Sequence, residues 1–441
     1  MFNYYLKLAF KSIKRNPILS ALMVTAIALG IGASMTTITI NYLMSADPIP
    51  NKSKQLFYVQ VDSWDPHNGY QDNSDDVDPP PNQLTWTDAT NLFAAKRASK
   101  QVAMGKSGGI IEPHDQDAKP FQASIRLTTG DFFSMFEVPF QYGNGWDAQA
   151  DEQREMVIVI NHDINDRVFG GENSVGKNIV LAGHTFRVVG VLKPWRPIPK
   201  FYDIGNGAFD YPEEVYLPLY LKEPLELPSW GNTNCWKQPA EDGFKGFLYS
   251  ECINFQMWVE LPNEADKAEY LNFLNNYAEE QKRLGRFPRP LNNRLTDVMG
   301  WLDKQKVVDQ DAKLMMWLSF MFLLVCLLNT IGLLLAKFTG KSAEIGLRRA
   351  VGATRGDLFK QYIIEAGCIG LLGGIAGLGL AMLGLQGIKS LYGDFVDNLA
   401  ALDGNMVLLA LALAIVSSVL AGLYPTWRAC NIAPASQLKS Q

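Results

Sequence analysis

Four long runs of apolar residues constrain this chain more than any other feature of its sequence. They cover residues 18–44, 314–336, 362–385 and 406–424, and the only charged residue among them is Glu365. A helix rises about 1.5 Å per residue, so about 20 residues cross the roughly 30 Å hydrocarbon core of a bilayer. The first run is also too long for the apolar part of a secretory signal peptide. The sequence therefore predicts an α-helical membrane protein with four transmembrane helices.

Basic residues gather on one side of these runs. Segments 1–17, 337–361 and 425–441 together hold twelve basic and two acidic residues, although the whole chain has a net charge of −5. Loops rich in lysine and arginine stay in the cytoplasm. We therefore expect both termini and the 337–361 loop to be cytoplasmic. Residues 45–313 and a short loop at 386–405 would then lie on the other side.

The large segment 45–313 is acidic and alternates short β-branched runs with turn residues, which indicates a mixed α/β domain. We expect an inserted β-rich subdomain at about 128–222 and a mobile surface loop at 72–81. Expected strands cover residues 56–61, 121–127, 156–160, 178–181, 185–191, 214–217 and 255–260. Expected helices cover residues 87–99, 131–136, 265–284 and 296–313. The last of these shows no turn signal before the second apolar run, so we expect one continuous helix that joins the domain rigidly to the membrane.

The first 17 residues combine apolar side chains with Lys7, Lys11, Lys14 and Arg15. This pattern suits a helix that lies on the inner leaflet with its basic residues facing anionic lipid headgroups. A solvated basic segment that only orients the first transmembrane helix fits the same residues.

The third apolar run is rich in glycine. Gly370 with Gly374, and Gly373 with Gly377, form pairs of small residues one helical turn apart, which let helices approach closely in lipid. We expect a tight helix–helix contact here, either within one subunit or across a dimer.

The segment 342–366, SAEIGLRRAVGATRGDLFKQYIIEA, has the most specific pattern in the chain. It predicts a short helix, a break at 352–354, and a second helix that enters the third apolar run. A short amphipathic helix can insert into a groove on a soluble partner. A positively charged loop alone would explain the arginines but not the alternation of apolar and charged residues. The candidate coupling residues are Glu344, Ile345, Arg348, Arg349, Val351, Gly352, Ala353 and Arg355.

This segment resembles the coupling helix of the FtsX-like permeases of ABC transporters, in particular their macrolide-exporter (MacB-type) branch. The family pattern is close to E-I-G-x-R-R-A-x-G-A-x-R, which residues 344–355 match. The ending YPTWRACNIAPA at 424–435 resembles the family's ending. Further similar strings occur at 128–136, 157–161, 169–177 and 186–191, whereas about 62–120 and 195–255 show no clear match.

The resemblance implies a type VII ABC permease fold with a MacB-like periplasmic core domain, in the bacterial inner membrane. It implies a dimer with a second copy or a homologous permease, and a separate ABC ATPase that binds ATP and magnesium, since this chain carries no fused ATPase domain. In the MacB-type branch, movements of the periplasmic domain expel substrate through a periplasmic adaptor and an outer-membrane channel. Two alternatives share the topology: a lipoprotein-releasing permease, and a non-transporting regulator of cell-wall hydrolases. The substrate is not specified by the sequence.

No catalytic site, metal site, bound cofactor or nucleic-acid partner is expected in this chain. Residues 171–177 (GENSVGK) nearly fit a phosphate-binding loop, but Asn178 stands where serine or threonine would hold magnesium, and a strand pattern follows. We expect a turn between strands there. The four histidines are widely separated, and no nucleophile motif is present.

Two of the five cysteines, Cys235 and Cys252, fall in the segment expected outside the cytoplasm. Disulfides persist in such oxidising compartments, so a bridge between them could close the loop that separates them. Two free, packed thiols remain the alternative, because the spacing alone does not place their α-carbons close together.

Overall fold

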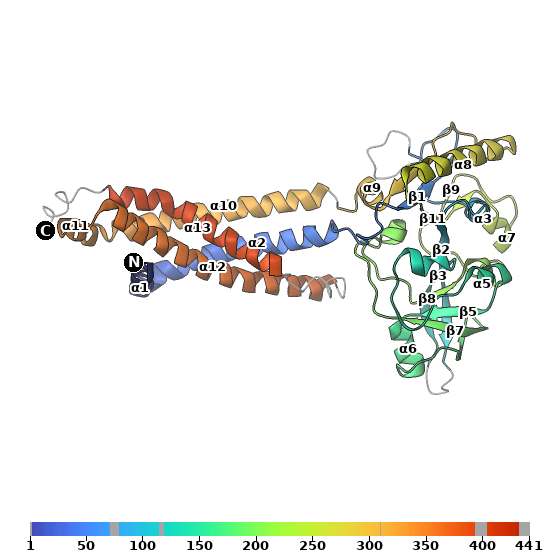
Figure 1. Ribbon diagram of the computed structural model, residues 1–441, viewed down its shortest axis with the longest axis horizontal. Helices are drawn as coiled ribbons and strands as arrows, with labels where there is room; N and C mark the ends of the chain where they lie inside the picture. Colours follow the sequence, from blue (N-terminus) through green and yellow to red (C-terminus); the bar gives the residue numbers. More distant parts are fainter. Residues whose placement is uncertain (1, 71–78, 114–118, 309, 393–403, 432–441) are drawn as a thin grey trace. The chain divides into compact units, whose positions relative to one another are not determined.

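The computed structural model describes residues 2–70, 79–113, 119–308, 310–392 and 404–431 (Figure 1). The chain divides into two compact units, a helical unit (Met1–Met44 with Val308–Gln441) and a large domain (Ser45–Val307). Most of the loop expected at 72–81, and most of the short loop expected at 386–405, lie outside the described residues. The predicted fold class, four long apolar helices with a mixed α/β domain, is confirmed.

Among its described residues, the helical unit contains four helices that are long and apolar enough to cross a membrane. The candidate spans are Pro17–Tyr42, Leu314–Thr339, Arg355–Gly387 and Val407–Cys430. The helices of this unit are α1 (Phe2–Arg15), α2 (Pro17–Met44), α10 (Gln310–Thr339), α11 (Ser342–Ala350), α12 (Arg355–Tyr392) and α13 (Gly404–Cys430). Helices α2, α10, α12 and α13 lie side by side and share one apolar core (Figure 1). Helix α1 packs against the start of α12.

Helices α12 and α13 extend furthest beyond the apolar runs that predicted them. Helix α12 begins at Arg355, well before residue 362, because Thr354 caps it there. Helix α13 does not end with its apolar run at residue 424 but continues through Pro425 to Cys430. Proline removes one backbone hydrogen bond from a helix. The last turn nevertheless persists because Thr426, Ala429 and Cys430 are buried.

The glycines of α12 bring two neighbouring helices close to it. A Cβ atom at Gly370 would lie 1.9 Å from the Ser418 hydroxyl oxygen, and one at Gly374 would lie 2.6 Å from the Ala414 Cβ, both on α13. A Cβ atom at Gly373 or Gly377 would lie 2.6 Å and 2.9 Å from the side chains of Ile27 and Ile31, respectively, on α2. The two pairs therefore serve contacts within one subunit, which was one of the two expected arrangements.

The described residues of the large domain form a ten-stranded sheet and a separate two-stranded one. The strands of the larger sheet are β1 (Leu56–Gln60), β2 (Lys100–Glu112), β3 (Phe121–Thr128), β4 (Phe140–Gly143), β5 (Val157–Ile160), β6 (Asn178–Leu181), β7 (His184–Leu192), β8 (Val215–Pro218), β11 (Phe255–Glu260) and β12 (Arg294–Asp297). They lie in the order β12-β1-β11-β2-β3-β8-β5-β7-β4. Strand β6 pairs with both β2 and β7, so β2, β3, β8, β5, β7 and β6 close into a barrel. The range 128–222, expected to be a β-rich subdomain, holds the barrel strands β5, β6, β7 and β8, whereas β2 and β3 begin before it in the sequence.

Side chains alternate between two buried faces of the open part of this sheet. Phe57 and Val59 of β1 point into one core, and Leu56 and Tyr58 point into the other. This period of two is that of a β-strand covered on both sides. The remaining elements are α3 (Trp86–Ala94), α4 (Asp131–Met135), α5 (Ala148–Gln153), α6 (His162–Phe169), α7 (Gly243–Leu248), α8 (Glu264–Arg283), α9 (Val298–Lys304), the 3-10 turns η1 (Phe201–Asn206) and η2 (Leu219–Leu221), and the short strands β9 (Asn234–Cys235) and β10 (Cys252–Ile253).

The continuous helix expected at 296–313 is wrong. Residues Arg294–Asp297 form β12 and Val298–Lys304 form α9, and α9 ends before α10 begins at Gln310. Local backbone contacts end α9. Lys306 has a positive φ of 47°, and the Val307 amide donates to the Leu302 carbonyl at 3.1 Å. Such a bond, together with an apolar contact by the residue that follows the turn, ends helices efficiently. Val307 makes that contact with the second core of the large domain.

Candidate functional site

Helix α11, at one end of the helical unit, holds the pattern that singled out the coupling segment. Ile345 is buried in the helical core, whereas Leu347 is 63% exposed and Val351, directly after the helix, is 82% exposed. Ala343, Leu347, Ala350 and Val351 recur at helical spacing and are all exposed. In the described part of the chain, nothing covers this apolar stripe. Ile345 therefore anchors the helix inward, and Leu347, absent from our set of candidate coupling residues, joins Val351 on the free face.

The charged residues of α11 hold it against its neighbours. The Glu344 carboxylate accepts hydrogen bonds from Arg348 at 2.7 Å, one turn along α11, and from Arg15 of α1 at 3.2 Å. Arg348 also donates to the amide oxygen of Gln361 on α12 at 2.8 Å. These contacts connect three helices, so Glu344 and Arg348 have a structural role at the site.

The break between α11 and α12 is fixed by local chemistry. Gly352 has a φ of +106°, which residues with a side chain rarely adopt, and the Ala353 amide donates to the Arg348 carbonyl at 3.0 Å. The Thr354 hydroxyl accepts from the Asp357 amide at 3.1 Å, and the Thr354 amide donates to the Asp357 carboxylate at 3.3 Å, which is a reciprocal cap. Arg355 donates to Asn431 at 3.3 Å. The Gly-Ala-Thr sequence thus fixes how the chain turns from α11 into α12.

A buried ion cluster lies next to this site. Lys337 of α10 and Glu365 of α12 are both fully buried, and the Lys337 ammonium lies 2.8 Å from the Glu365 carboxylate. Lys341, in the turn between α10 and α11, lies 3.7 Å from the same carboxylate. The Ser12 hydroxyl of α1 donates a hydrogen bond to the Glu365 carboxylate and accepts one from the Lys341 ammonium. The Ser20 hydroxyl of α2 accepts from Lys337 at 3.1 Å. Burial lowers the pKa of Lys341, and the Glu365 carboxylate opposes that effect. The sequence singled out Glu365 but gave no partner for it.

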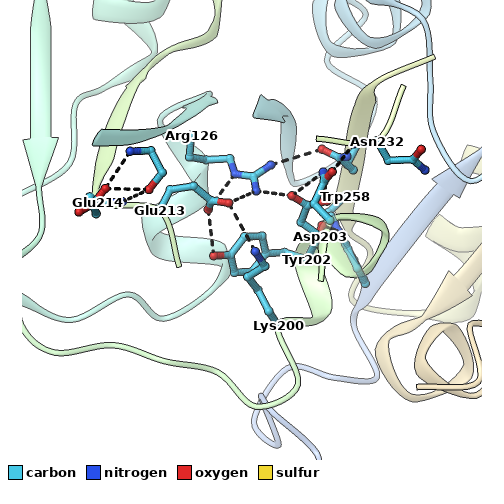
Figure 2. A network of polar contacts seen from close by, with 11 residues as sticks. Arg126, Lys200, Tyr202, Asp203, Glu213, Glu214, Asn232 and Trp258 are labelled. Carbon is cyan, nitrogen blue, oxygen red and sulfur yellow. Dashed lines mark hydrogen bonds and ion pairs between the residues drawn. The ribbon is translucent and has the colours of Figure 1, made fainter. Parts of the chain in front are cut away.

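The large domain has a second buried polar network, around Arg126 of β3. Figure 2 shows the carboxylates of Glu213 and Asp203 on either side of the Arg126 guanidinium, and both form ion pairs with it. Lys200 lies 3.5 Å from Glu213, and the Tyr202 hydroxyl donates to the same carboxylate at 3.3 Å. The four charged groups sum to zero and are fully buried. Burial alone would raise the pKa of Glu213, but Arg126 and Lys200 outweigh it and hold that pKa at about 2.

This network joins segments that are distant in the sequence. Glu213 precedes β8, Asp203 lies in η1, and Gln256 of β11 accepts from Arg126 at 3.4 Å. The Trp258 indole, also on β11, donates to the Tyr202 carbonyl at 3.2 Å (Figure 2). The network therefore ties the barrel to the open part of the sheet. A lone arginine in a strand gave no signal of this in the sequence.

Cys235 and Cys252 are register partners in the two-stranded sheet of β9 and β10. Their sulfur atoms are 1.98 Å apart, and the structure joins them as a disulfide. Cys326, Cys368 and Cys430, all in the helical unit, are free thiols.

Residues 171–177 form the loop between α6 and β6, so a helix precedes them and a strand follows. The expected turn between two strands is therefore wrong on the side before the loop. This order is the reverse of a phosphate-binding loop, which needs a strand before it and a helix after it. Within the described ranges, no group of three or more His, Cys, Asp or Glu side chains could hold a metal ion.

Comparison with known families decides what these two units belong to. The model of the MacB-like periplasmic core domain matches residues 20–272, more than half of the chain, and the model of the FtsX-like permease C-terminal region matches residues 316–434. The chain belongs to the family of FtsX-like permeases with a MacB-like periplasmic core domain. The predicted family is thereby confirmed.

Named relatives of this permease are distant. It is 23% identical over 322 residues to the pyoverdine export ATP-binding/permease protein PvdT of Pseudomonas aeruginosa, covering 73% of this chain and 43% of that protein. It is 21% identical over 360 residues to the macrolide export ATP-binding/permease protein MacB of Neisseria gonorrhoeae, covering 80% of this chain and 49% of that protein. The permease thus spans less than half the length of either relative.

Among solved structures, the periplasmic region of MacB from Actinobacillus actinomycetemcomitans matches 59% of this permease and 96% of its own chain, with a TM-score of 0.36 and 16% identity. The extracellular domain of the transporter YknZ from Gram-positive bacteria matches 50% of the permease and 94% of its own chain, with a TM-score of 0.31 and 13% identity.

Proposed function

We propose that this permease transmits the work of a separate ABC ATPase, which binds ATP and magnesium, to its own large domain. The observation that carries the proposal is the exposed apolar stripe of α11, formed by Ala343, Leu347, Ala350 and Val351, next to Arg349. An amphipathic helix with one apolar face free is suited to a groove on a soluble protein. The basic segments around α11 support a cytoplasmic location for this end of the permease, where ATP is available.

The internal contacts of α11 suit it for transmission. Because Glu344 and Arg348 bond α1 and α12, and the Gly352 turn fixes the path into α12, a push on the stripe displaces whole helices. In a dimer, a second ATPase would displace the helices of a second permease, identical or homologous, in the same way. Movement of the transmembrane helices would then be passed to the large domain. In this proposal, the helices cross the inner membrane of a bacterium and the large domain lies in its periplasm.

Efflux is the transport process that we favour. The two ATP-binding/permease relatives are named for pyoverdine export and macrolide export, and a periplasmic adaptor with an outer-membrane channel would complete such a system. A lipoprotein-releasing permease and a regulator of cell-wall hydrolases use the same topology and remain the competing functions. The proteins that accompany the permease distinguish the three: an adaptor and channel, a lipoprotein carrier, or a hydrolase activator.

The test is purification of the full-length permease from its native membrane in mild detergent, followed by identification of its partners by mass spectrometry. Leu347→Glu should lower the amount of co-purified ATPase at least about tenfold, because an unpaired charge in an apolar groove costs several kcal/mol. Leu284→Glu is the matched control, since Leu284 of the large domain is equally apolar and 68% exposed. Equal ATPase recovery from both variants would mean that the stripe is not the docking site.

A further inference from the structure

A basic cavity lies beside α11, and the coupling role just proposed does not use it. It has a volume of about 150 Å³ and lies among α1, the turn after α10, α11 and α12 of the helical unit. Among the described residues, four cationic side chains line it, Lys11, Arg15, Lys341 and Arg348, together with one acid, Glu344. The lining therefore carries a net charge of +3, which calls for an anion.

The cations of this cavity are incompletely neutralised by the chain. Glu344 is shared between Arg15 and Arg348, and Glu365, behind the wall, is shared between Lys337 and Lys341. For Lys11, no ion pair occurs among the described residues. One further anion in the cavity would therefore meet several donors at once, and charge-assisted hydrogen bonds of this kind are roughly twice as strong as neutral ones.

The cavity is built as well as charged. Ser12, Gln361 and Tyr362 of its wall are buried, so its inner end is fixed by packed side chains. At its outer end, Arg15 is 73% exposed and Lys11 is exposed as well. A cavity of about this volume holds a benzene ring in another protein, and a phosphate group is smaller than that ring.

Helix α1 indicates where the anion comes from. Tyr5, Ala9 and Ser12 face the helical core, while Phe10 is exposed beside Lys7 and Lys14 on the outer side. An exposed aromatic ring between lysines is typical of a helix that lies in the headgroup layer of a membrane. Basic pockets between transmembrane helices at such a surface bind the headgroups of anionic lipids.

We propose that the cavity lined by Lys11, Arg15, Lys341 and Arg348 binds the phosphate of an anionic phospholipid headgroup. The headgroup then bridges α1 to α11 by adding an acceptor for Arg15 and Arg348 beside Glu344. It adds to the contacts that Glu344 and Arg348 already make, so the ATPase-docking helix of the proposed function is held more firmly in an anionic leaflet. Lipid binding itself does not depend on the ATPase.

The test compares two double variants of the full-length permease, both purified without any ATPase. Lys11→Gln with Arg15→Gln removes two cations of the cavity, and Lys7→Gln with Lys14→Gln removes two exposed cations from the same helix outside it. Each protein is reconstituted in phosphatidylcholine with phosphatidylglycerol, washed in detergent, and examined by native mass spectrometry for retained lipid. We expect wild type and the Lys7/Lys14 variant to retain one phosphatidylglycerol, and the Lys11/Arg15 variant to retain about tenfold less.

Equal retention in the two double variants would overturn the proposal, because it would mean that only the general charge of α1 attracts the lipid. A second arm adds inorganic phosphate to protein in phosphatidylcholine alone and follows thermal stability. The proposal expects a shift with phosphatidylglycerol and none with inorganic phosphate. An equal shift with both would overturn the lipid as the source of the anion. Because no ATPase is present, failure here leaves the docking proposal untouched.

Discussion

The Lys337 ammonium lies 2.8 Å from the Glu365 carboxylate, and neither side chain has any exposed surface. The pair joins α10 to α12, and Ser12 and Ser20 attach α1 and α2 to it through hydrogen bonds. Charged residues within membrane-spanning helices are expensive unless they are paired, and they face the interior of the bundle. Here they hold together four helices of the unit, α1, α2, α10 and α12.

Replacing Glu365 by glutamine should destabilise the helical unit. It leaves Lys337 buried and Lys341 half-buried without their carboxylate, and breaking a buried pair in this way costs about 3–5 kcal/mol. Alkylation of Cys326, Cys368 and Cys430 during heating reports this unit alone, because the two cysteines of the large domain are bonded to each other. We expect the variant's thiols to react at a lower temperature.

The double variant Lys337→Met with Glu365→Leu is the control. It removes both charges and replaces them by apolar side chains, so it should lose much less stability than Glu365→Gln. If the double variant were the less stable protein, the ion pair would not be the source of the effect.

Replacing Arg126 by methionine should destabilise the large domain by about 3–5 kcal/mol, because Asp203 and Glu213 would be left buried with only Lys200 nearby. Eight of the ten tryptophans lie between residues 45 and 307, so tryptophan fluorescence during urea unfolding measures this domain. Arg187→Met is the matched control. Arg187 forms a half-exposed pair with Glu155 at 3.4 Å, and such pairs contribute about 0–1 kcal/mol. Equal losses in both variants would contradict the role of the network.

Asp151 should make the stability of the large domain depend on pH. Burial raises the pKa of its carboxyl from 3.8 to about 7, although the amide of Gly130 and the indole of Trp146 donate to it and oppose the shift. A raised pKa means that the folded domain favours the protonated form. The preference of the folded domain for protonated Asp151 stabilises it fully below pH 3.8, and this stabilisation is lost as the pH rises through about 7.

The measurement is the unfolding free energy of wild type minus that of Asp151→Asn across this pH range. The difference should fall between pH 4 and pH 7 and be constant at higher pH. Asp163→Asn is the control, since the Asp163 side chain is 70% exposed. A difference that does not change with pH would refute the assignment.

Elements with a strong local pattern were predictable from the sequence. The seven expected strands all occur, and each end falls within one residue of its prediction. Helix α3 ends at Ala94 and not at residue 99, since Lys96 has a positive φ of 48°. Apolar length and periodic β-branched runs are properties of neighbouring residues, which is why they can be read from one chain.

What the sequence missed depends on residues far apart. Strand β2 was missed because Gly105, Gly108 and Gly109 weaken the strand pattern. In the structure, the ring of Phe255 occupies the space beside Gly105, where a Cβ atom would lie 2.8 Å from it. Arg126 likewise acquires its partners only when segments 77 or more residues away fold against it. The amphipathic pattern of α11 is visible in the sequence, but whether Ile345 or Leu347 faces outward depends on how α11 packs in the helical core.

Alkylation of the denatured permease should count its thiols. Without reduction, three cysteines should react, and after reduction all five should react, because Cys235 and Cys252 are bonded to each other. A mass-tagged maleimide followed by mass spectrometry gives the number directly. Five reactive cysteines before reduction would rule out the bridge in the protein from cells.

Gly370 lies on the face of α12 that packs against α13, so its substitution should destabilise the helical unit. A Cβ atom at Gly370 would lie 1.9 Å from the Ser418 hydroxyl oxygen and 2.9 Å from the Ala414 carbonyl oxygen, and the backbone cannot give way easily. Gly370→Ala should therefore push α13 away from α12 and lower the temperature at which the free thiols become reactive. Overpacking of this kind costs about 1–3 kcal/mol.

Gly379→Ala is the matched control on the same helix, because a Cβ atom there meets no described atom within 4 Å. Alanine forms helices better than glycine by about 1 kcal/mol, so this variant should be as stable as wild type or slightly more so. The comparison also addresses the dimer. If Gly379→Ala leaves the monomer stable but lowers the dimer fraction in light scattering, then the face of α12 that holds Gly379 packs against the second permease. The face that holds Gly370 would then serve only the subunit's own fold.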